Sequence, residues 1–230
     1  MANHKSIYDN ESNMYEDMIA RQPDMLEIIR DIRPVEGLDV LDLGAGTGRL
    51  AATIAPRAQS VVCTDVSSAM LERLDQKLNN LSIPKNWSTC VADHRELPLA
   101  DASVDLVVSG WSICYLTHSG IEDGPKQLER ILQEIERVLK PQGTVIIIET
   151  LGTGTTTPAP PDFLESYFSL LEKHYEFSHR WIRMDYSYDH PQQAVEMMTF
   201  FFGDELAARI KEHQWSTVPE CAGIWYKHYK

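Results

Sequence analysis

The sequence predicts an α/β fold in which a parallel sheet is flanked by helices on both faces. Short apolar runs alternate with longer segments of helical periodicity from residue 40 to residue 149, which is typical of successive β-α units. The first apolar run, Val40 to Leu43, stops at a turn with glycines at positions 44, 46 and 48. The next two runs end at Asp65 and Asp93. This pattern indicates strands whose carboxyl ends carry turns and polar side chains.

The first 39 residues are expected to form a helical cap or lid. Pro23 and Asp24 precede apolar residues at helical spacing, and Arg33-Pro34 follows them. This helix ends there because the residue before a proline disfavours helical backbone. Tyr8 and Tyr15 stand in a polar setting before the helix. We interpret that segment as a flap that closes over a site.

Residues 40–150 are expected to form the ligand-binding core. Ser67 is typical of a helix N-cap, because its hydroxyl can accept a backbone N–H of the first turn. The charged residues of the last helix in this region, Glu134 and Arg137 among them, are expected to form a solvated face. The predicted strands are 40–43, Ser60–Thr64, Trp87–Ala92, Val104–Ser109 and Thr144–Glu149, and the predicted helices are Arg49–Ala55, Ala69–Leu78 and Lys126–Lys140.

Residues 151–230 are expected to complete the sheet and to carry inserted helices that cap a substrate. Gly152 to Pro161 is rich in threonine and proline, so we expect a surface loop there. No flexible linker divides the chain, which indicates one structural domain overall. The elements predicted after the loop are a helix at Asp162–His174, a strand at Tyr175–Tyr188, helices at Gln192–Phe202 and Asp204–Glu212, and a strand at Cys221–Tyr229.

Composition narrows the class of ligand. The 230 residues carry 21 Lys and Arg against 34 Asp and Glu, a formal net charge of −13, which disfavours attraction to nucleic-acid phosphates.

The four cysteines and eight histidines show no metal-ligand spacing, so free thiols and no metal are expected. No apolar stretch approaches a membrane span, and the polar start is unlike a signal peptide. We expect a cytoplasmic protein, monomer or homodimer, that binds neither nucleic acid nor membrane.

The glycine turn indicates a bound small molecule, because glycine permits φ > 0 and lets the backbone approach a ligand closely. In parallel sheets, ligands bind outside the carboxyl ends of the strands. A carboxylate about 20 residues beyond such a turn can accept both hydroxyls of a ribose, and Asp65 has this spacing. Asp93 and His94 stand where an adenine can lie. The sequence therefore predicts an adenosine-containing ligand.

The residues around the turn separate the possible adenosine ligands. A dinucleotide requires Gly-x-Gly-x-x-Gly to seat its pyrophosphate, whereas here the third glycine is Gly48 and Arg49 follows it. Asp42 lies before the turn, where its charge would repel a pyrophosphate but suits a cationic ligand with an amino group. This favours S-adenosylmethionine, and it disfavours a nicotinamide-dependent oxidoreductase.

Four motifs in order resemble the class I S-adenosylmethionine-dependent methyltransferases, of the small-molecule group called type 11. They are Val40–Ala51, Val62–Leu71, Ala92–Leu99 with Asp101, Ser103 and Asp105, and Leu139–Gly143. The resemblance covers about residues 35–150. It implies a Rossmann-like, mostly parallel sheet of seven strands in the order 3-2-1-4-5-7-6, with the last strand antiparallel.

The resemblance also implies how the cofactor is held. The backbone of the glycine turn would face the methionine and ribose, and Asp65 would accept the ribose hydroxyls. Asp93 would meet the adenine amine, with His94 adjoining it, and Trp111 would border the methyl group. With Asp42 from the argument above, the predicted cofactor-binding residues are Asp42, Gly44, Ala45, Gly46, Asp65, Val66, Met70, Asp93, His94 and Ser109.

Methyl transfer from a sulfonium is an in-line displacement with an activated leaving group, so alignment and desolvation supply most of the catalysis. An amine or hydroxyl acceptor also needs a histidine or tyrosine to take its proton. The stretch Trp111 to Leu116 departs from the histidine-rich stretch of many relatives, so no base is carried over from the family. The candidates for catalysis and for the acceptor pocket are Tyr8, Tyr15, His94, Trp111 and Tyr115.

The predicted function is therefore methyl transfer from S-adenosylmethionine to a small-molecule acceptor. The alternative is a non-catalytic module on the same fold that senses S-adenosylmethionine or docks a protein partner. The acceptor atom, whether O, N, S or C, is left open.

Overall fold

The structure, a computed structural model, describes residues 12–230 and divides them into two compact units. The described residues of the smaller unit are 12–23, 150–160 and 181–222. The larger unit comprises residues 24–149, 161–180 and 223–230. The predicted roles of residues 1–39 as a lid and of residues 151–230 as a cap stay predictions.

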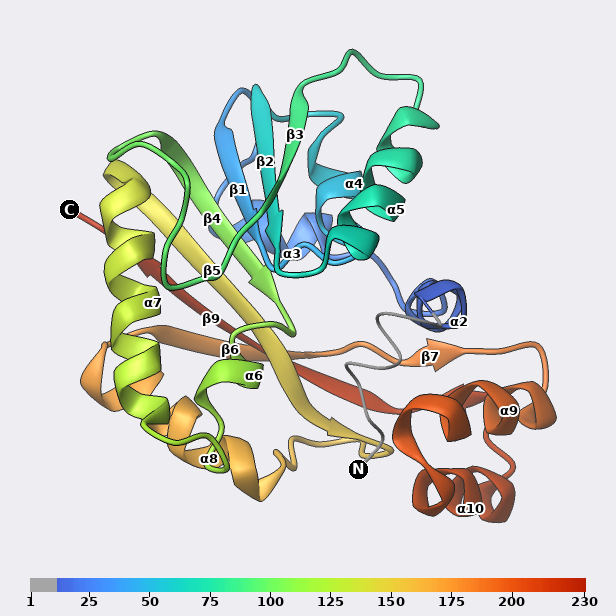
Figure 1. Cartoon of the computed structure of the whole chain (residues 1–230). Coiled ribbons are helices and arrows are strands. Elements are labelled where there is room, and N and C mark those ends of the chain that lie inside the picture. The colour runs from blue at the N-terminus through green and yellow to red at the C-terminus, as the bar shows by residue number, and fades with distance from the viewer. Residues whose placement is uncertain (1–11) are drawn as a thin grey trace. The chain divides into compact units, whose positions relative to one another are not determined.

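A seven-stranded sheet forms the core, in the order β3-β2-β1-β4-β5-β9-β6 (Figure 1). Strand β1 pairs in parallel with both β2 and β4, so the direction of the strand order reverses between them. The predicted strand order is confirmed. The strands of this sheet are β1 Asp39–Leu43, β2 Ser60–Asp65, β3 Trp87–Val91, β4 Val104–Gly110, β5 Leu139–Thr153, β6 Ser178–Arg183 and β9 Glu220–His228.

Strand β9 runs antiparallel to β5, as the bonds at its two ends show. Tyr229 donates its N–H to the carbonyl of Gly143, whereas Gly154 donates to Pro219. Strand β5 begins at Leu139, directly after a helix, and not at Thr144 as predicted. The residues between these two positions form an irregularity against β4. Pro141 and Gly143, which indicate a turn in the sequence, therefore lie inside strand β5.

Helices flank the sheet (Figure 1). Their apolar faces are buried: Met70, Leu71, Leu74 and Leu78 of α5, and Leu128, Ile131, Leu132, Ile135 and Val138 of α7. Burial of such a stripe, and not helix propensity, supplies most of a helix's stability. These helices are α3 Leu26–Ile32, α4 Ala51–Ile54, α5 Ser68–Asn79, α6 Cys114–Thr117, α7 Gly124–Val138 and α8 Asp162–Ser169, which continues as the π-helical turn η1 Leu170–His174.

The smaller unit has its own core. Its elements are α2 Ser12–Ile19, β7 Tyr186–Ser187, α9 Pro191–Phe202, α10 Asp204–His213 and β8 Thr217–Val218, with β7 and β8 paired antiparallel. Met18, Met198, Ile210 and Val218 lie in its buried cluster. The two predicted helices are confirmed, but the single strand predicted at Tyr175–Tyr188 is wrong, because Met184 and Asp185 separate β6 from β7. Within residues 12–230, no helix combines the length and apolar character needed to cross a membrane.

Candidate functional site

The glycine turn after β1 is held by the neighbouring strand. Gly44 and Ala45 both donate their N–H groups to the carbonyl of Thr64, at 2.8 Å each. Gly44, Gly46 and Gly48 have φ of +75°, +53° and +83°, the left-handed region that other residues adopt at a cost. A Cβ on Gly44 would lie 1.9 Å from Ser112 Oγ. Glycine is therefore required here by both backbone and space.

Asp42 supports this turn from the interior. Its side chain is buried, and Oδ2 accepts the N–H of Ala51 at 2.9 Å, which is the first amide of α4. Burial raises the pKa of Asp42 to about 7. Helix α4 begins at Ala51 and not at Arg49 as predicted. The structure thus places the Asp42 carboxyl against a helix terminus.

Asp65 links the turn to the next helix. Its Oδ2 accepts the N–H of Gly46 and its Oδ1 accepts that of Ser67, both at 2.9 Å. Ser67 caps α5, as predicted, by accepting the Met70 N–H. The Met70 side chain is buried and lies 3.6 Å from where a Cβ on Gly46 would stand, whereas Val66 is 67% exposed. The turn after β1 and the loop after β2 therefore form one hydrogen-bonded edge.

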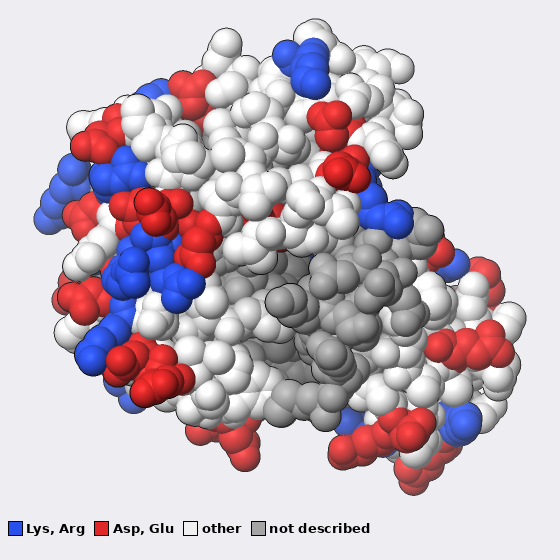
Figure 2. Space-filling model, in the orientation of Figure 1, with Lys and Arg blue, Asp and Glu red and all other residues white. Residues whose placement is uncertain are grey.

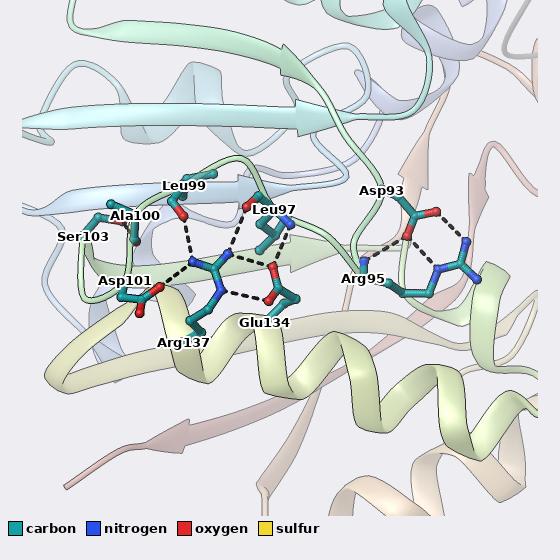
Figure 3. A network of polar contacts seen from close by, with 9 residues as sticks. All are labelled: Asp93, Arg95, Leu97, Leu99, Ala100, Asp101, Ser103, Glu134 and Arg137. Carbon is teal, nitrogen blue, oxygen red and sulfur yellow. Dashed lines mark hydrogen bonds and ion pairs between the residues drawn. The ribbon is translucent and has the colours of Figure 1, made fainter.

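Asp93, after β3, is paired with Arg95. Arg95 donates its backbone N–H and its Nε to Asp93 Oδ1, at 2.9 and 2.7 Å, and its Nη2 to Oδ2 (Figure 3). These bonds hold the pKa of Asp93 at about 2. Arg95 also donates to Gln127 Oε1 of α7. Asp93 is thus a fixed anion whose orientation depends on Arg95. The sequence predictions did not include Arg95, although its position two residues after Asp93 could have indicated this pairing.

His94 turns inward beneath the glycine turn. It is buried, its Nε2 lies 2.8 Å from Ser112 Oγ, and its Cε1 lies 3.1 Å from the position of a Cβ on Gly44. Among the described residues, no group hydrogen-bonds its Nδ1. Burial lowers the pKa of His94, so the ring is neutral at pH 7. Ser112 is not among the residues predicted from the sequence, because only its tertiary contacts with His94 and Gly44 indicate that it belongs to the site.

The end of β4 supplies the remaining wall. Ser109 is buried, and its hydroxyl donates to the carbonyl of Leu43, which ties β4 to β1. Trp111 has φ +50°, and the Arg49 guanidinium lies 3.9 Å from the centre of its indole ring, a cation–π distance. Tyr115, in α6, is 39% exposed.

The larger unit thus brings together most of the predicted residues at the carboxyl ends of β1, β2, β3 and β4. Tyr15 lies in α2 of the smaller unit, with its ring 5.7 Å from that of Phe201, so its place in an acceptor pocket stays a prediction. Tyr8 lies outside the described residues. Among residues 12–230, no cluster of three or more His, Cys, Asp or Glu side chains is suited to a metal ion.

The segment after Asp93 is anchored by α7, which corrects the expectation of a solvated charged face. Arg137 donates to the carbonyls of Leu97 and Leu99 and to the carboxylates of Asp101 and Glu134 (Figure 3). Glu134 in turn accepts the Leu97 N–H at 2.7 Å. Figure 2 shows basic and acidic side chains interspersed over the region of α7. Two charged residues of this helix, Glu134 and Arg137, therefore bind backbone groups of the segment.

Replacing Arg137 by methionine is expected to lower the free energy of unfolding by about 1–3 kcal/mol, because two carbonyls and Glu134 lose a charged donor. Urea unfolding followed by circular dichroism measures it. Arg130→Met is the matched control, since Arg130 is exposed on the same helix. Equal stability of the two variants would contradict the anchoring role.

A seven-stranded sheet in this order, with a glycine turn after β1 and an aspartate after β2 at the point where strand order reverses, defines the class I methyltransferase fold. Residues 41–147 match the family model described as "Methyltransferase domain". Residues 41–147 therefore form a methyltransferase domain, with the fold of the class I S-adenosylmethionine-dependent enzymes.

Curated relatives carry several acceptor names. The chain is 34% identical over 134 residues to a demethylmenaquinone methyltransferase of Lactobacillus johnsonii, covering 57% of this chain and 50% of the relative. It is 30% identical over 176 residues to a malonyl-[acyl-carrier protein] O-methyltransferase of Geobacter sulfurreducens, covering 74% of this chain and 61% of the relative. The chain therefore spans about half to three fifths of these two relatives.

Solved structures agree on the fold. A SAM-dependent methyltransferase from Aquifex aeolicus aligns with a TM-score of 0.60 at 18% identity, covering 94% of this chain and 96% of that one. A phosphoethanolamine N-methyltransferase from Haemonchus contortus, solved with phosphoethanolamine and S-adenosylhomocysteine, aligns with a TM-score of 0.55 at 18% identity, covering 96% and 48%. At this identity the likeness concerns the fold alone.

Proposed function

We propose that the chain transfers a methyl group from S-adenosylmethionine to a small-molecule acceptor at the edge formed by Gly44–Gly48, Asp65 and Trp111. The observation that carries the proposal is the glycine turn with positive φ, in which a Cβ on Gly44 has no space. The names of the relatives, which include a quinone and an acyl-carrier substrate, support methyl transfer but differ in the acceptor.

The residues present fit the cofactor. The backbone of Gly44 and Gly46 offers close approach, and Asp65 can exchange its two backbone partners for the hydroxyls of a ribose. Exposed Val66 and buried Met70 would contact the adenine, and the fixed carboxylate of Asp93 would accept a hydrogen bond from its amine. In this proposal Asp42 and Ser109 do not contact the cofactor. They hold the backbone at Ala51 and Leu43, on either side of the glycine turn.

When bound, S-adenosylmethionine supplies an activated methyl group on a sulfonium. The chain's own work is to exclude water and to align the acceptor, which can contribute ~7–11 kcal/mol for well-oriented reactants. Trp111, stacked on Arg49, and Tyr115 border the acceptor. His94 is neutral, and its buried Nδ1 has no hydrogen-bond partner among the described residues, so it is our candidate to take a proton from a hydroxyl or amine.

Asp65→Ala is expected to weaken S-adenosylhomocysteine binding by about 10- to 150-fold, because a charged hydrogen-bond acceptor contributes about 1.5–3 kcal/mol. Isothermal titration calorimetry measures this. Glu72→Ala removes the same charge from an exposed position of α5 and should leave binding unchanged.

An absence of binding to the wild type at high micromolar ligand would refute the cofactor proposal. A screen of labelled S-adenosylmethionine against thiols, amines, phenols and carboxylates then identifies the acceptor class. Tight cofactor binding with no transfer to any class would favour the sensing alternative.

A further inference from the structure

A buried glutamate of β5 contacts the segment that follows β4. Glu149, in β5, has no exposed surface. Its Oε1 accepts the N–H of Cys114 at 3.0 Å and the hydroxyl of Tyr167 at 3.4 Å. Its Oε2 has no hydrogen-bond partner among residues 12–230. Burial raises the pKa of Glu149 to about 7, so an ionisable group is held here against its solvation preference.

The Cys114 amide is the first of α6, a helix of only four residues. Its N-cap residue, Ile113, offers no side-chain acceptor. The first amides of a helix lack partners within the helix and need acceptors from elsewhere. Glu149, in a neighbouring strand, supplies the acceptor for the Cys114 amide. The N-cap residue Ile113 cannot supply it, because its side chain has no polar atom.

The segment 111–115, which we call the α6 turn, carries the groups that face the proposed site. Tyr115 donates its N–H to the carbonyl of Ser112, and the Ser112 hydroxyl meets His94 Nε2 at 2.8 Å. Trp111, which has a positive φ, donates its N–H to the carbonyl of Ile148. Two successive residues of β5 therefore hold the α6 turn, Ile148 through backbone and Glu149 through its side chain.

We propose that Glu149 is a positioning residue for methyl transfer, which holds the α6 turn so that Ser112 stays on His94 beneath the glycine turn. The proposal rests on the proposed function for its consequence, but its geometry is a property of the protein without ligand. The proposed role requires a hydrogen-bond acceptor that reaches the Cys114 amide, which a side chain of the length of glutamate provides. It does not require a negative charge.

Three substitutions separate reach from charge. Glu149→Gln keeps an oxygen at the same reach, Glu149→Asp keeps the charge on a shorter side chain, and Glu149→Leu removes the acceptor. Tyr167→Phe is the control, because it removes only the longer of the two bonds to Oε1. Each variant is tested for folding by circular dichroism before use.

The first readout is the imidazole Cε1–H signal of His94 in carbon-13-labelled protein without cofactor, assigned by its loss in His94→Gln. We expect this signal to shift in the Asp and Leu variants and in Ser112→Ala, and to stay in place in the Gln and Phe variants. Adding Glu149→Leu to Ser112→Ala should cause no further shift, because both changes break the same contact.

The second readout is affinity for S-adenosylhomocysteine. We expect a loss of about tenfold in the Asp and Leu variants, equivalent to about 1.4 kcal/mol, and less than twofold in the Gln variant. An unchanged His94 signal in a folded Glu149→Asp or Glu149→Leu variant overturns the proposal. Failure of both variants to fold, while Glu149→Gln folds, also overturns it, because Glu149 would then be purely structural. Wild type that does not bind the ligand refutes the proposed function alone, since the His94 signal is read without ligand.

Discussion

Gly44→Ala is expected to weaken S-adenosylhomocysteine binding by at least ~30-fold. The new methyl would lie 1.9 Å from Ser112 Oγ, 2.5 Å from Ser112 Cβ and 3.1 Å from His94 Cε1. Contacts this short force the turn or the serine to move, and overpacking of this kind costs about 1–3 kcal/mol. The φ of +75° adds roughly 1–2 kcal/mol for any residue with a Cβ.

Gly37→Ala separates the two effects. Gly37 has φ +71°, but nothing lies within 4 Å of its added Cβ, so this variant carries the backbone penalty without the clash. It should lose stability and keep its affinity in calorimetric titration. The double variant Gly44→Ala with Ser112→Gly removes two of the three short contacts and should regain part of the binding. Tight binding by Gly44→Ala alone would show that the cofactor does not use this turn.

The buried carboxyls of Asp42 and Glu149 are expected to make stability fall as the pH rises towards neutrality. Burial raises both pKa values to about 7, from ordinary values of 3.8 and 4.5. Between about pH 4 and pH 7 the folded state therefore holds protons that the unfolded state has released, and the free energy of unfolding decreases with pH. The full effect is on the order of 3–4 kcal/mol for each group.

This effect is measured as a difference between variants, because His94 and His179 have lowered pKa values and act in the opposite sense below their ordinary value of 6.5. Urea unfolding at intervals from pH 4.5 to pH 8 gives the free energy for wild type, Asp42→Asn and Glu149→Gln. Each variant should gain stability relative to wild type as the pH rises. Asp39→Asn is the control, since the pKa of Asp39 is lowered and its titration lies below this range. Curves parallel to that of wild type would contradict the prediction.

Local pattern alone predicts most of the strands and helices of the core. The strands beginning at Ser60, Trp87 and Val104 and the helix at 124–138 were predicted within two residues of their observed starts, because apolar periodicity reflects which faces must be buried. The glycine turn and Asp65 were also evident, since their chemistry depends on residue type and spacing along one chain. Strand order followed only from the family resemblance.

The contacts that shape the site depend on residues distant in sequence. Nothing local indicates that Ser112 closes on Gly44, that Asp42 satisfies the amide of Ala51, or that Glu149 does the same for α6. The helix pattern predicts a solvated Arg137, but three of its hydrogen bonds go to Leu97, Leu99 and Asp101 of the loop before β4.

The sequence by itself determined the class of this protein and the strands, turn and carboxylates of its cofactor edge, because periodicity and residue type are written along the chain. Tertiary structure alone decided which polar groups meet, since a buried donor or acceptor must find a partner wherever the packed elements bring one. For this reason Asp42 lies beneath the turn, and His94 rests on a serine that no motif singles out.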